Sequence, residues 1–305
     1  MSSLSNKGNA KSMAKKLFNT KIGLALGGGA AKGIAHVGVL KALEDQKVNI
    51  RYIAGTSVGA MIASLYAFSV SVDDIGALAK RLTMSKVTSF KLSKTGFFTT
   101  ASLRDLMVEY IGEVNIEDAK MPLAIVATDI RNGEEIILRS GSVADAVCAS
   151  AAIPGIYIPV EIGNRSLVDG GLVQNVPIEA LQTMGAGVII ASHLNSASQY
   201  SEISHVLDIM RNAFEIAVSH HTQDQLKDAD VVISMDVSEF SLRDNTDRYD
   251  ELFAIGYGSA AKQLSKLAWY KKGNVLLYPW RAAKEIAPFK VPEALKRVQD
   301  KTESS

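Results

Sequence analysis

The sequence has few of the features that mark disulfide-stabilised, metal-binding or membrane-spanning proteins. Cys148 is its only cysteine, which excludes an internal disulfide and a metal site of the paired-cysteine kind. The 33 basic and 32 acidic side chains nearly cancel, and this balance argues against a broad nucleic-acid surface. No apolar run approaches the roughly 20 residues that span a bilayer. With 47% hydrophobic and 21% charged residues, the composition is that of a folded globular protein.

The two ends of the chain are expected to be tails. Residues 1–20 are basic but contain no apolar stretch of signal-peptide length, so we expect a cytoplasmic protein with a mobile N-terminal tail. A solvated leader is the simpler interpretation of this tail, and contact with anionic lipid is the alternative. A second tail is expected over residues 286–305.

Short strand-like runs alternate with longer helical patterns from residue 21 onward. The apolar residues of 34–43, for example, recur at helical spacing directly after a strand that ends in glycines. This alternation predicts one α/β domain with a central, mostly parallel sheet and helices on both faces. We expect the core over residues 21–200 and the helices and strand of 201–285 packed on the same domain.

The middle of the chain gives weaker signals. Residues 73–120 have a mainly helical pattern without an obvious strand. Two strands are then predicted around a turn at 131–133, and Asp129 is assigned to turn formation. The next predicted helix contains Cys148, whose thiol is expected to pack inside, and it stops at Pro154.

The first of three glycine-rich corners is Gly27 to Gly33, between a strand and a helix. Backbone N–H groups and the helix dipole at such a corner stabilise negative charge, either a bound phosphate or a transient oxyanion. No Lys-Ser or Lys-Thr pair closes the loop, which excludes a P-loop. The next strand ends without an acidic residue for a ribose, which argues against a dinucleotide site. Close packing of a helix on a strand also explains such glycines.

The second corner is Gly55-Thr56-Ser57-Val58-Gly59. In this strand-to-helix context Gly-x-Ser-x-Gly is typical of a nucleophile elbow, where small neighbours permit a sharp turn that exposes the serine hydroxyl. A tight turn with Ser57 as the helix N-cap is the structural alternative. The motif alone leaves both interpretations open.

The third corner, Asp169-Gly170-Gly171, offers a base for Ser57. An aspartate with the usual pKa of about 3.9 is a poor base for a hydroxyl, but burial in an apolar cleft raises that pKa. A carboxylate acting directly on serine is then chemically reasonable. An Asp-Gly-Gly turn without catalytic meaning is the commoner explanation when the motif stands alone.

Histidine is the usual base for a catalytic serine, and the sequence has five. His193 lies at the carboxyl end of a predicted strand, where α/β enzymes keep functional groups, so it is the reserve base. His36 is expected to pack inside the first helix. The remaining three belong to a long helical pattern over 201–228 and look half exposed: His205, His220 and His221.

Together the three corners resemble the patatin-like phospholipase family, serine acyl hydrolases with a Ser-Asp dyad. The family block Gly-x-Gly-x-x-Arg/Lys-Gly corresponds to 27–33, and its Gly-x-Ser-x-Gly and Asp-Gly-Gly correspond to 55–59 and 169–171. The stretches ASAAIPGIYIPV and NVPIEAL are also similar to family sequence, so the similarity spans about residues 21–195. The later FSLRDNTDRYDELFAIGYGSA is similar to the C-terminal part of bacterial relatives.

The resemblance implies roles for individual residues. Ser57 is then the nucleophile and Asp169 the base that activates it. Gly170 supports Asp169, and Lys32 orients the loop or attracts a phosphate head group, although a solvated Lys32 is equally consistent. No cofactor, metal ion or calcium requirement is expected. The implied oxyanion hole is formed by the amides of Gly27, Gly28 and Gly29.

The resemblance also implies a lipid ester substrate, a phospholipid or lysophospholipid, with peripheral contact at the inner membrane surface. A general carboxylesterase or thioesterase, and a non-catalytic protein that binds lipid or a partner, are the alternatives. Residues 86–98 suit membrane docking or a lid over the site, and an ordinary loop explains them as well. The side chains concerned are Lys86, Lys91, Lys94, Phe90, Phe97 and Phe98.

Overall fold

The computed structural model describes residues 21–81, 89–90, 95–195, 203–240 and 248–273, and residues 21–263 form one compact unit. The tails expected at 1–20 and 286–305 lie outside the described residues. The strands are β1 (Ile22–Leu26), β2 (Ile50–Thr56), β3 (Ser89–Phe90), β4 (Phe98–Thr99), β5 (Leu123–Asp129), β6 (Glu134–Leu138), β7 (Val160–Ile162), β8 (Arg165–Asp169), β9 (Val188–Asn195) and β10 (Val231–Asp236).

Helices alternate with most of these strands along the chain. The α-helices are α2 (Ile34–Asp45), α3 (Val58–Ala67), α4 (Val72–Arg81), α6 (Ala101–Ile111), α7 (Val143–Ser150), α8 (Gly171–Gln174), α9 (Ile178–Thr183), α10 (Val206–Gln225) and α11 (Tyr249–Gly273). Three short 3₁₀ helices are η1 (Ala30–Gly33), η2 (Ile116–Asp118) and η3 (Leu226–Asp228). None of these described helices is both long and apolar enough to cross a membrane.

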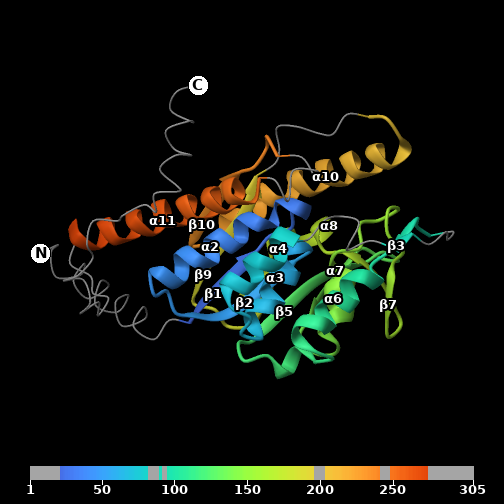
Figure 1. Ribbon diagram of the computed structural model, residues 1–305, viewed down its shortest axis with the longest axis horizontal. Coiled ribbons are helices and arrows are strands. Elements are labelled where there is room, and N and C mark those ends of the chain that lie inside the picture. The colour runs from blue at the N-terminus through green and yellow to red at the C-terminus, as the bar shows by residue number, and fades with distance from the viewer. Residues whose placement is uncertain (1–20, 82–88, 91–94, 196–202, 241–247, 274–305) are drawn as a thin grey trace, which may run out of the picture. The chain divides into compact units, whose positions relative to one another are not determined.

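The described strands other than β3 and β4 form one eight-stranded sheet (Figure 1). Its order is β10-β9-β1-β2-β5-β8-β7, and β6 pairs with β5. The neighbours from β10 to β5 are parallel, whereas β6, β7 and β8 join in antiparallel pairs. The predicted α/β fold with a mostly parallel sheet is therefore confirmed.

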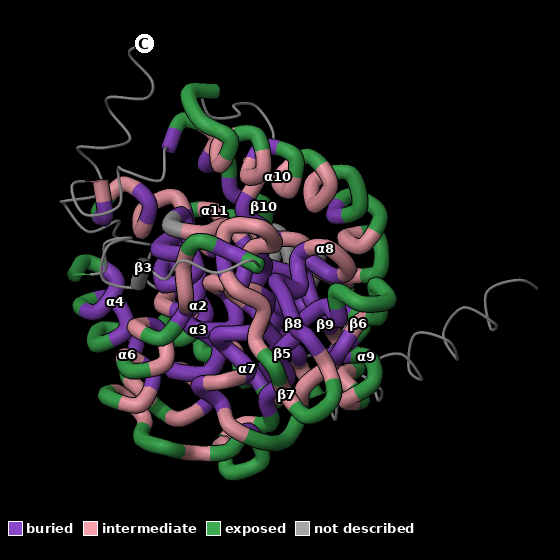
Figure 2. The backbone as a smooth tube through the Cα atoms, turned by 90° about the vertical axis from the view of Figure 1, so that its right-hand side faces the viewer, coloured by how far each residue is buried: buried purple, intermediate pink, exposed green. Residues whose placement is uncertain are grey.

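Both faces of the sheet are buried at the central strands β1 and β5, which explains why these strands are apolar along most of their length. Ala25 and Ala191 pack in a cluster with Ile178 and Leu181 on one face, which α9 covers. Leu24 and Leu26 alternate with Ala25, so they point to the opposite face, which α2 and α3 cover (Figure 1). Figure 2 shows β5, β8 and β9 as buried, with exposed residues on the outer helices.

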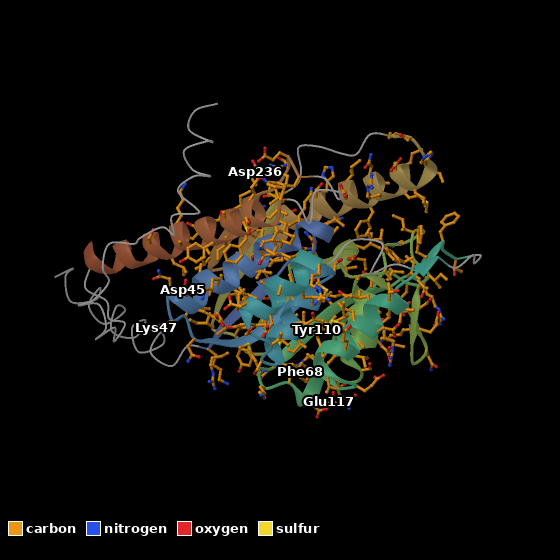
Figure 3. All side chains as sticks on the ribbon, in the orientation of Figure 1. Asp45, Lys47, Phe68, Tyr110, Glu117 and Asp236 are labelled. Carbon is orange, nitrogen blue, oxygen red and sulfur yellow. The ribbon has the colours of Figure 1, made fainter. Side chains whose placement is uncertain are left out.

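The first two corners meet because β1 and β2 are parallel neighbours, so their carboxyl ends lie at one edge of the sheet. Helix α2 starts directly after the glycine corner and ends at Asp45, labelled in Figure 3, so only its N-terminal end belongs to that edge. The helix α3 likewise starts directly after Ser57.

The structure differs from the sequence-based expectations mainly in detail. Within 73–120 it has α4, α6 and η2 as expected, but β3 and β4 also form a short antiparallel ladder. The helix α7 ends at Ser150, before Pro154. Asp129 forms the predicted turn, because its Oδ1 accepts the N–H of Arg131 at 3.1 Å. Cys148 is buried in α7, as expected.

Candidate active site

Ser57 sits in a strained turn between β2 and α3. Its φ of 55° and ψ of −124° lie outside the conformations common for a side-chain-bearing residue. Such a conformation costs about 1–3 kcal/mol and persists only where the surroundings impose it. The Ser57 side chain makes no cap hydrogen bond to α3, so the helix-cap alternative does not describe this serine.

The two glycines of the motif permit close backbone contacts around this turn. A Cβ on Gly55 would lie 2.5 Å from the backbone nitrogen of Ala60. A Cβ on Gly59 would lie 2.7 Å from the carbonyl oxygen of Gly27, in the first corner. Any larger residue at either position would push α3 away from the ends of β1 and β2. The Gly-x-Ser-x-Gly spacing thus follows from packing as well as from exposure of the hydroxyl.

Ser150 holds the strained backbone in place. Its Oγ accepts the N–H of Ser57 at 2.8 Å and donates to the carbonyl oxygen of Val126 at 2.6 Å. Ser150 is completely buried at the end of α7. This hydroxyl therefore satisfies a donor of the turn and ties it to β5. Sequence reasoning did not single out Ser150, although it lies in the ASAAIP stretch that is similar to family sequence.

Strand register brings Asp169 level with Ser57. Thr56 pairs with Val126 across β2 and β5, and Ala127, the next residue of β5, pairs with Asp169 of β8. Because β8 is antiparallel to β5, Asp169 reaches the edge from the opposite strand direction. The prediction that Asp169 lies at the end of a strand is confirmed. Its position beside Ser57 depends on the antiparallel pairing of β8 with β5.

The Ser57 hydroxyl lies beside the Asp169 carboxylate, close enough to act on its pKa. Asp169 is 2% exposed, and its Oδ1 also accepts the N–H of Gly171 at 2.8 Å. Burial raises the pKa of the Asp169 carboxyl to about 7, against smaller lowering effects of the Gly171 N–H and the Ser57 hydroxyl. A carboxyl with this pKa exchanges a proton readily near neutral pH, as a general base must.

The glycine corner lies beside Ser57, but not all of its amides are free. A Cβ on Gly28 would lie 3.4 Å from the Ser57 Cβ. The Gly27 N–H donates to the Ser192 carbonyl and the Gly28 N–H to the Asn175 carbonyl, each at 3.0 Å. Two of the three amides predicted for the oxyanion hole are therefore already engaged. Gly29, which is partly exposed, is the remaining candidate of the three.

His36 supports this corner from α2. Its Nε2 lies 2.8 Å from the Gly27 carbonyl oxygen and its Nδ1 lies 2.8 Å from the Ser192 hydroxyl. A carbonyl only accepts, so Nε2 carries the proton and Nδ1 accepts from Ser192. Burial lowers the pKa of His36 to about 4, which keeps the ring neutral. The expected packed histidine thus also fixes the position of the loop.

Lys32 is buried, with 9% exposure, so the solvated alternative does not describe it. Burial lowers the pKa of the Lys32 amine, and the negative charge of Glu215 on α10 opposes this effect. The pKa of Glu215 is raised by its own burial and lowered by Lys32 and Arg211. These charges link the glycine corner to α10.

His193 is not joined to Ser57 by any hydrogen bond. Both of its ring nitrogens are buried without a partner among the described residues, and burial lowers its pKa to about 4. His205 precedes α10 as its N-cap, and His220 and His221 are exposed on that helix. Asp169 is thus the titratable side chain that contacts Ser57. Within the described residues, no group of three or more His, Cys, Asp or Glu is arranged to hold a metal ion.

The basic and aromatic segment expected to form a lid is described only in part. Lys86, Lys91 and Lys94 lie outside the described residues. Phe97 is 37% exposed, and the ring of Phe98 lies 6.3 Å from that of Tyr157. The lid itself stays a prediction.

A strained serine that contacts a buried aspartate at the edge of an α/β sheet has the form of a serine-hydrolase site. The model of the patatin-like phospholipase family matches residues 24–181, just over half of the chain. The chain therefore belongs to the patatin-like phospholipase family, and the resemblance inferred from the three corners is confirmed.

Two relatives illustrate the similarity. An uncharacterized NTE family protein of Mycobacterium tuberculosis is 33% identical over 180 residues, which cover 58% of this chain and 50% of that protein. The lysophospholipase nte1 of Emericella nidulans is 33% identical over 196 residues, covering 62% of this chain and 13% of that protein. The chain thus spans half of the mycobacterial relative and a small part of the fungal one.

Among solved structures, VipD from Legionella pneumophila aligns with a TM-score of 0.49 and 14% identity. The alignment covers 81% of this chain and 67% of that chain.

Proposed function

We propose that this protein is a serine acyl hydrolase that cleaves carboxylic ester bonds of phospholipids or lysophospholipids. The observation that carries the proposal is that the strained Ser57 and the buried Asp169, which come from distant parts of the sequence, lie side by side. Membership of the patatin-like phospholipase family and a relative named as a lysophospholipase support a lipid ester as substrate.

In the first half of the reaction, Asp169 takes the proton of Ser57 as Oγ attacks the ester carbonyl carbon. The tetrahedral intermediate collapses when the bond to the leaving alcohol breaks and Asp169 returns its proton to that alcohol. In the second half, Asp169 takes a proton from water, and the resulting hydroxide attacks the acyl-enzyme. Ser57 recovers its proton as the fatty acid leaves, so the site returns to its starting state.

The negative oxygen of each intermediate needs donors beside Ser57. We propose that the Gly29 N–H is one of them, because the N–H groups of Gly27 and Gly28 bond to Ser192 and Asn175. Each such donor lowers the barrier by about 3 kcal/mol. Lys32 and Gly170 are proposed to keep the two loops in place, with Lys32 held near Glu215.

Turnover of phospholipid, lysophospholipid and short soluble esters by three variants tests the proposal. Ser57→Ala and Asp169→Asn should each lower kcat by about 10⁴ while circular dichroism shows an unchanged fold. Asp129→Asn is the matched control, since Asp129 is likewise a buried aspartate but lies at the end of β5, where it forms a turn. This variant should keep activity. Near-normal turnover by Asp169→Asn would contradict its role as the base. A preference for short soluble esters would favour a general carboxylesterase.

A further inference from the structure

Exposed apolar side chains are concentrated on one helix. Six large hydrophobic side chains are exposed among the described residues, and four of them lie on α10 or just before it: Ile203 (65%), Val206 (60%), Ile209 (52%) and Ile216 (41%). Positions 206, 209, 213 and 216 are three or four residues apart, so they fall on one side of the helix. Ala213, between them, is also exposed. We call Val206, Ile209, Ala213 and Ile216 the outer ridge.

The opposite side of α10 lies against the candidate active site. A Cβ on Gly171 would lie 3.3 Å from the Phe214 ring and from Val218, and the Gly171 N–H is bonded to Asp169. Asn175, at the end of α8, donates from Nδ2 to Thr222 of α10 at 3.1 Å. Gly171 thus lies between the helix that carries the outer ridge and Asp169, the proposed base.

The loop after α7 and the neighbouring Phe97 form a second apolar segment beside the N-terminal half of α10. Gly155, in the loop after α7, packs against Met210. The next residue, Ile156, accepts the N–H of Phe97 through its carbonyl at 3.0 Å, and Phe97 is another of the six exposed side chains. The same loop holds Asp169, because the Ala152 carbonyl accepts the Asp169 N–H at 2.8 Å. Apolar surface therefore flanks the site on two elements.

The charged side chains of this part of α10 point away from the outer ridge. Arg211, the one Lys or Arg in 203–225, bonds to Asp208 at 3.1 Å, and Glu215 interacts with Lys32 beneath the helix. At 100° per residue, all three lie on the side opposite the ridge. Among the described residues 203–216, the outer side of α10 is therefore apolar and carries no Lys or Arg. Figure 2 shows α10 on the outside of the fold with much of its surface exposed.

We propose that the outer ridge and Phe97 dock on the surface of a lipid bilayer and so bring Ser57 and Asp169 to their substrate. This inference rests on the proposed function, since a lipid ester substrate is what makes a lipid surface the occupant. An apolar helix face at the interface binds in proportion to the apolar area it buries. The ridge itself contains no Lys or Arg, so its part of the docking should depend on buried apolar area and not on anionic lipid or salt.

Co-sedimentation with phosphatidylcholine vesicles tests the docking surface, with Ser57→Ala as background so that no lipid is hydrolysed. Adding Ile209→Asp and Ile216→Asp should weaken vesicle binding at least about tenfold. Adding Ile130→Asp is the matched control: Ile130 is 45% exposed but lies at the turn after β5, and binding should be unchanged. Raising salt to about 0.5 M should also leave binding unchanged.

Kinetics on the active enzyme separate docking from chemistry. The double variant with Ile209→Asp and Ile216→Asp should lose vesicle hydrolysis about tenfold and keep turnover of a soluble butyrate ester within about twofold. A milder pair, Val206→Ser and Ile209→Ser, repeats the test with less risk to the helix.

Three outcomes would overturn the docking surface: no vesicle binding by the parent protein, equal binding by the ridge and Ile130 variants, or a ridge change that halves the molar mass in light scattering while vesicle binding persists. The last outcome would assign the ridge to a second copy of the chain. If the unmodified protein hydrolyses no ester, the proposed function is refuted. Vesicle binding by the ridge variants would still show whether the outer ridge is a docking surface.

Discussion

Replacing Asp169 with asparagine should remove activity and, at the same time, stabilise the fold above neutral pH. The buried carboxyl has a pKa of about 7 in the folded protein instead of 3.8, so the folded state binds its proton more tightly than the unfolded chain does. The stability due to this proton is fully present below about pH 4 and is lost as pH rises through 7. Asparagine has the same shape and never ionises, so it avoids that loss.

The size of the effect follows from the two pKa values. At 1.36 kcal/mol per unit, the change from 3.8 to about 7 corresponds to about 4 kcal/mol at pH 8 and about 1.5 kcal/mol at pH 5. Solvent screening is weak here, because the Asp169 side chain is only 2% exposed. The gain in unfolding free energy of Asp169→Asn over wild type should therefore grow by about 2–3 kcal/mol between pH 5 and pH 8.

Urea unfolding at pH 5 and pH 8 measures this difference directly. The variant Ser57→Ala is the control, because it lacks the proposed nucleophile but keeps the ionisable carboxyl. Its stability should fall with pH at least as steeply as that of wild type, since the Ser57 hydroxyl lowers the pKa of Asp169. A gain for Asp169→Asn that is the same at both pH values would refute a strongly raised carboxyl pKa. The same holds if Asp169→Asn is less stable than wild type and the difference is greater at pH 8 than at pH 5.

Three further predictions concern the same site. The kcat/KM for ester hydrolysis should rise with pH through a midpoint near 7, because Asp169 must be ionised to accept a proton, and a midpoint near 4 would contradict this. Ser150→Ala should lower unfolding free energy by about 1–3 kcal/mol and kcat about tenfold, since the Ser57 N–H loses its acceptor; wild-type kinetics would show that the bond does not position Ser57. Gly59→Ala should lower stability by about 1–3 kcal/mol in thermal unfolding, whereas Gly258→Ala, with nothing within 4 Å of its Cβ position, should not.

Much of the fold could be predicted because strands buried on both faces and helices leave clear apolar patterns. The run IGLAL of β1 and the helix after it are examples, and both corners that follow parallel strands were recognised from their glycines. The short β3 and β4 were missed because two-residue strands carry no periodic signal. The antiparallel direction of β8 was missed because a strand's partner depends on long-range contacts.

The two side chains proposed to react, Ser57 and Asp169, could be predicted from the sequence, but the residues that hold them in place could not. Ser57 and Asp169 stand in motifs whose residue types fit the chemistry, so they could be named from sequence. Ser150 and His36 each act through two hydrogen bonds to backbone or hydroxyl groups, and such bonds leave no pattern in a sequence. The hydrogen bond from the Gly28 N–H to the Asn175 carbonyl likewise arises from tertiary packing. It leaves fewer N–H donors for the oxyanion hole than the sequence predicted.

The proposed function depends most on attack by the Ser57 hydroxyl, which Asp169 is proposed to activate. Incubation with a fluorophosphonate, followed by peptide mapping in a mass spectrometer, locates the reactive residue of the active enzyme. We expect a single adduct on Ser57, formed far more slowly when Asp169 is replaced by asparagine. An adduct on another residue, or an unchanged rate of labelling in Asp169→Asn, would contradict the account.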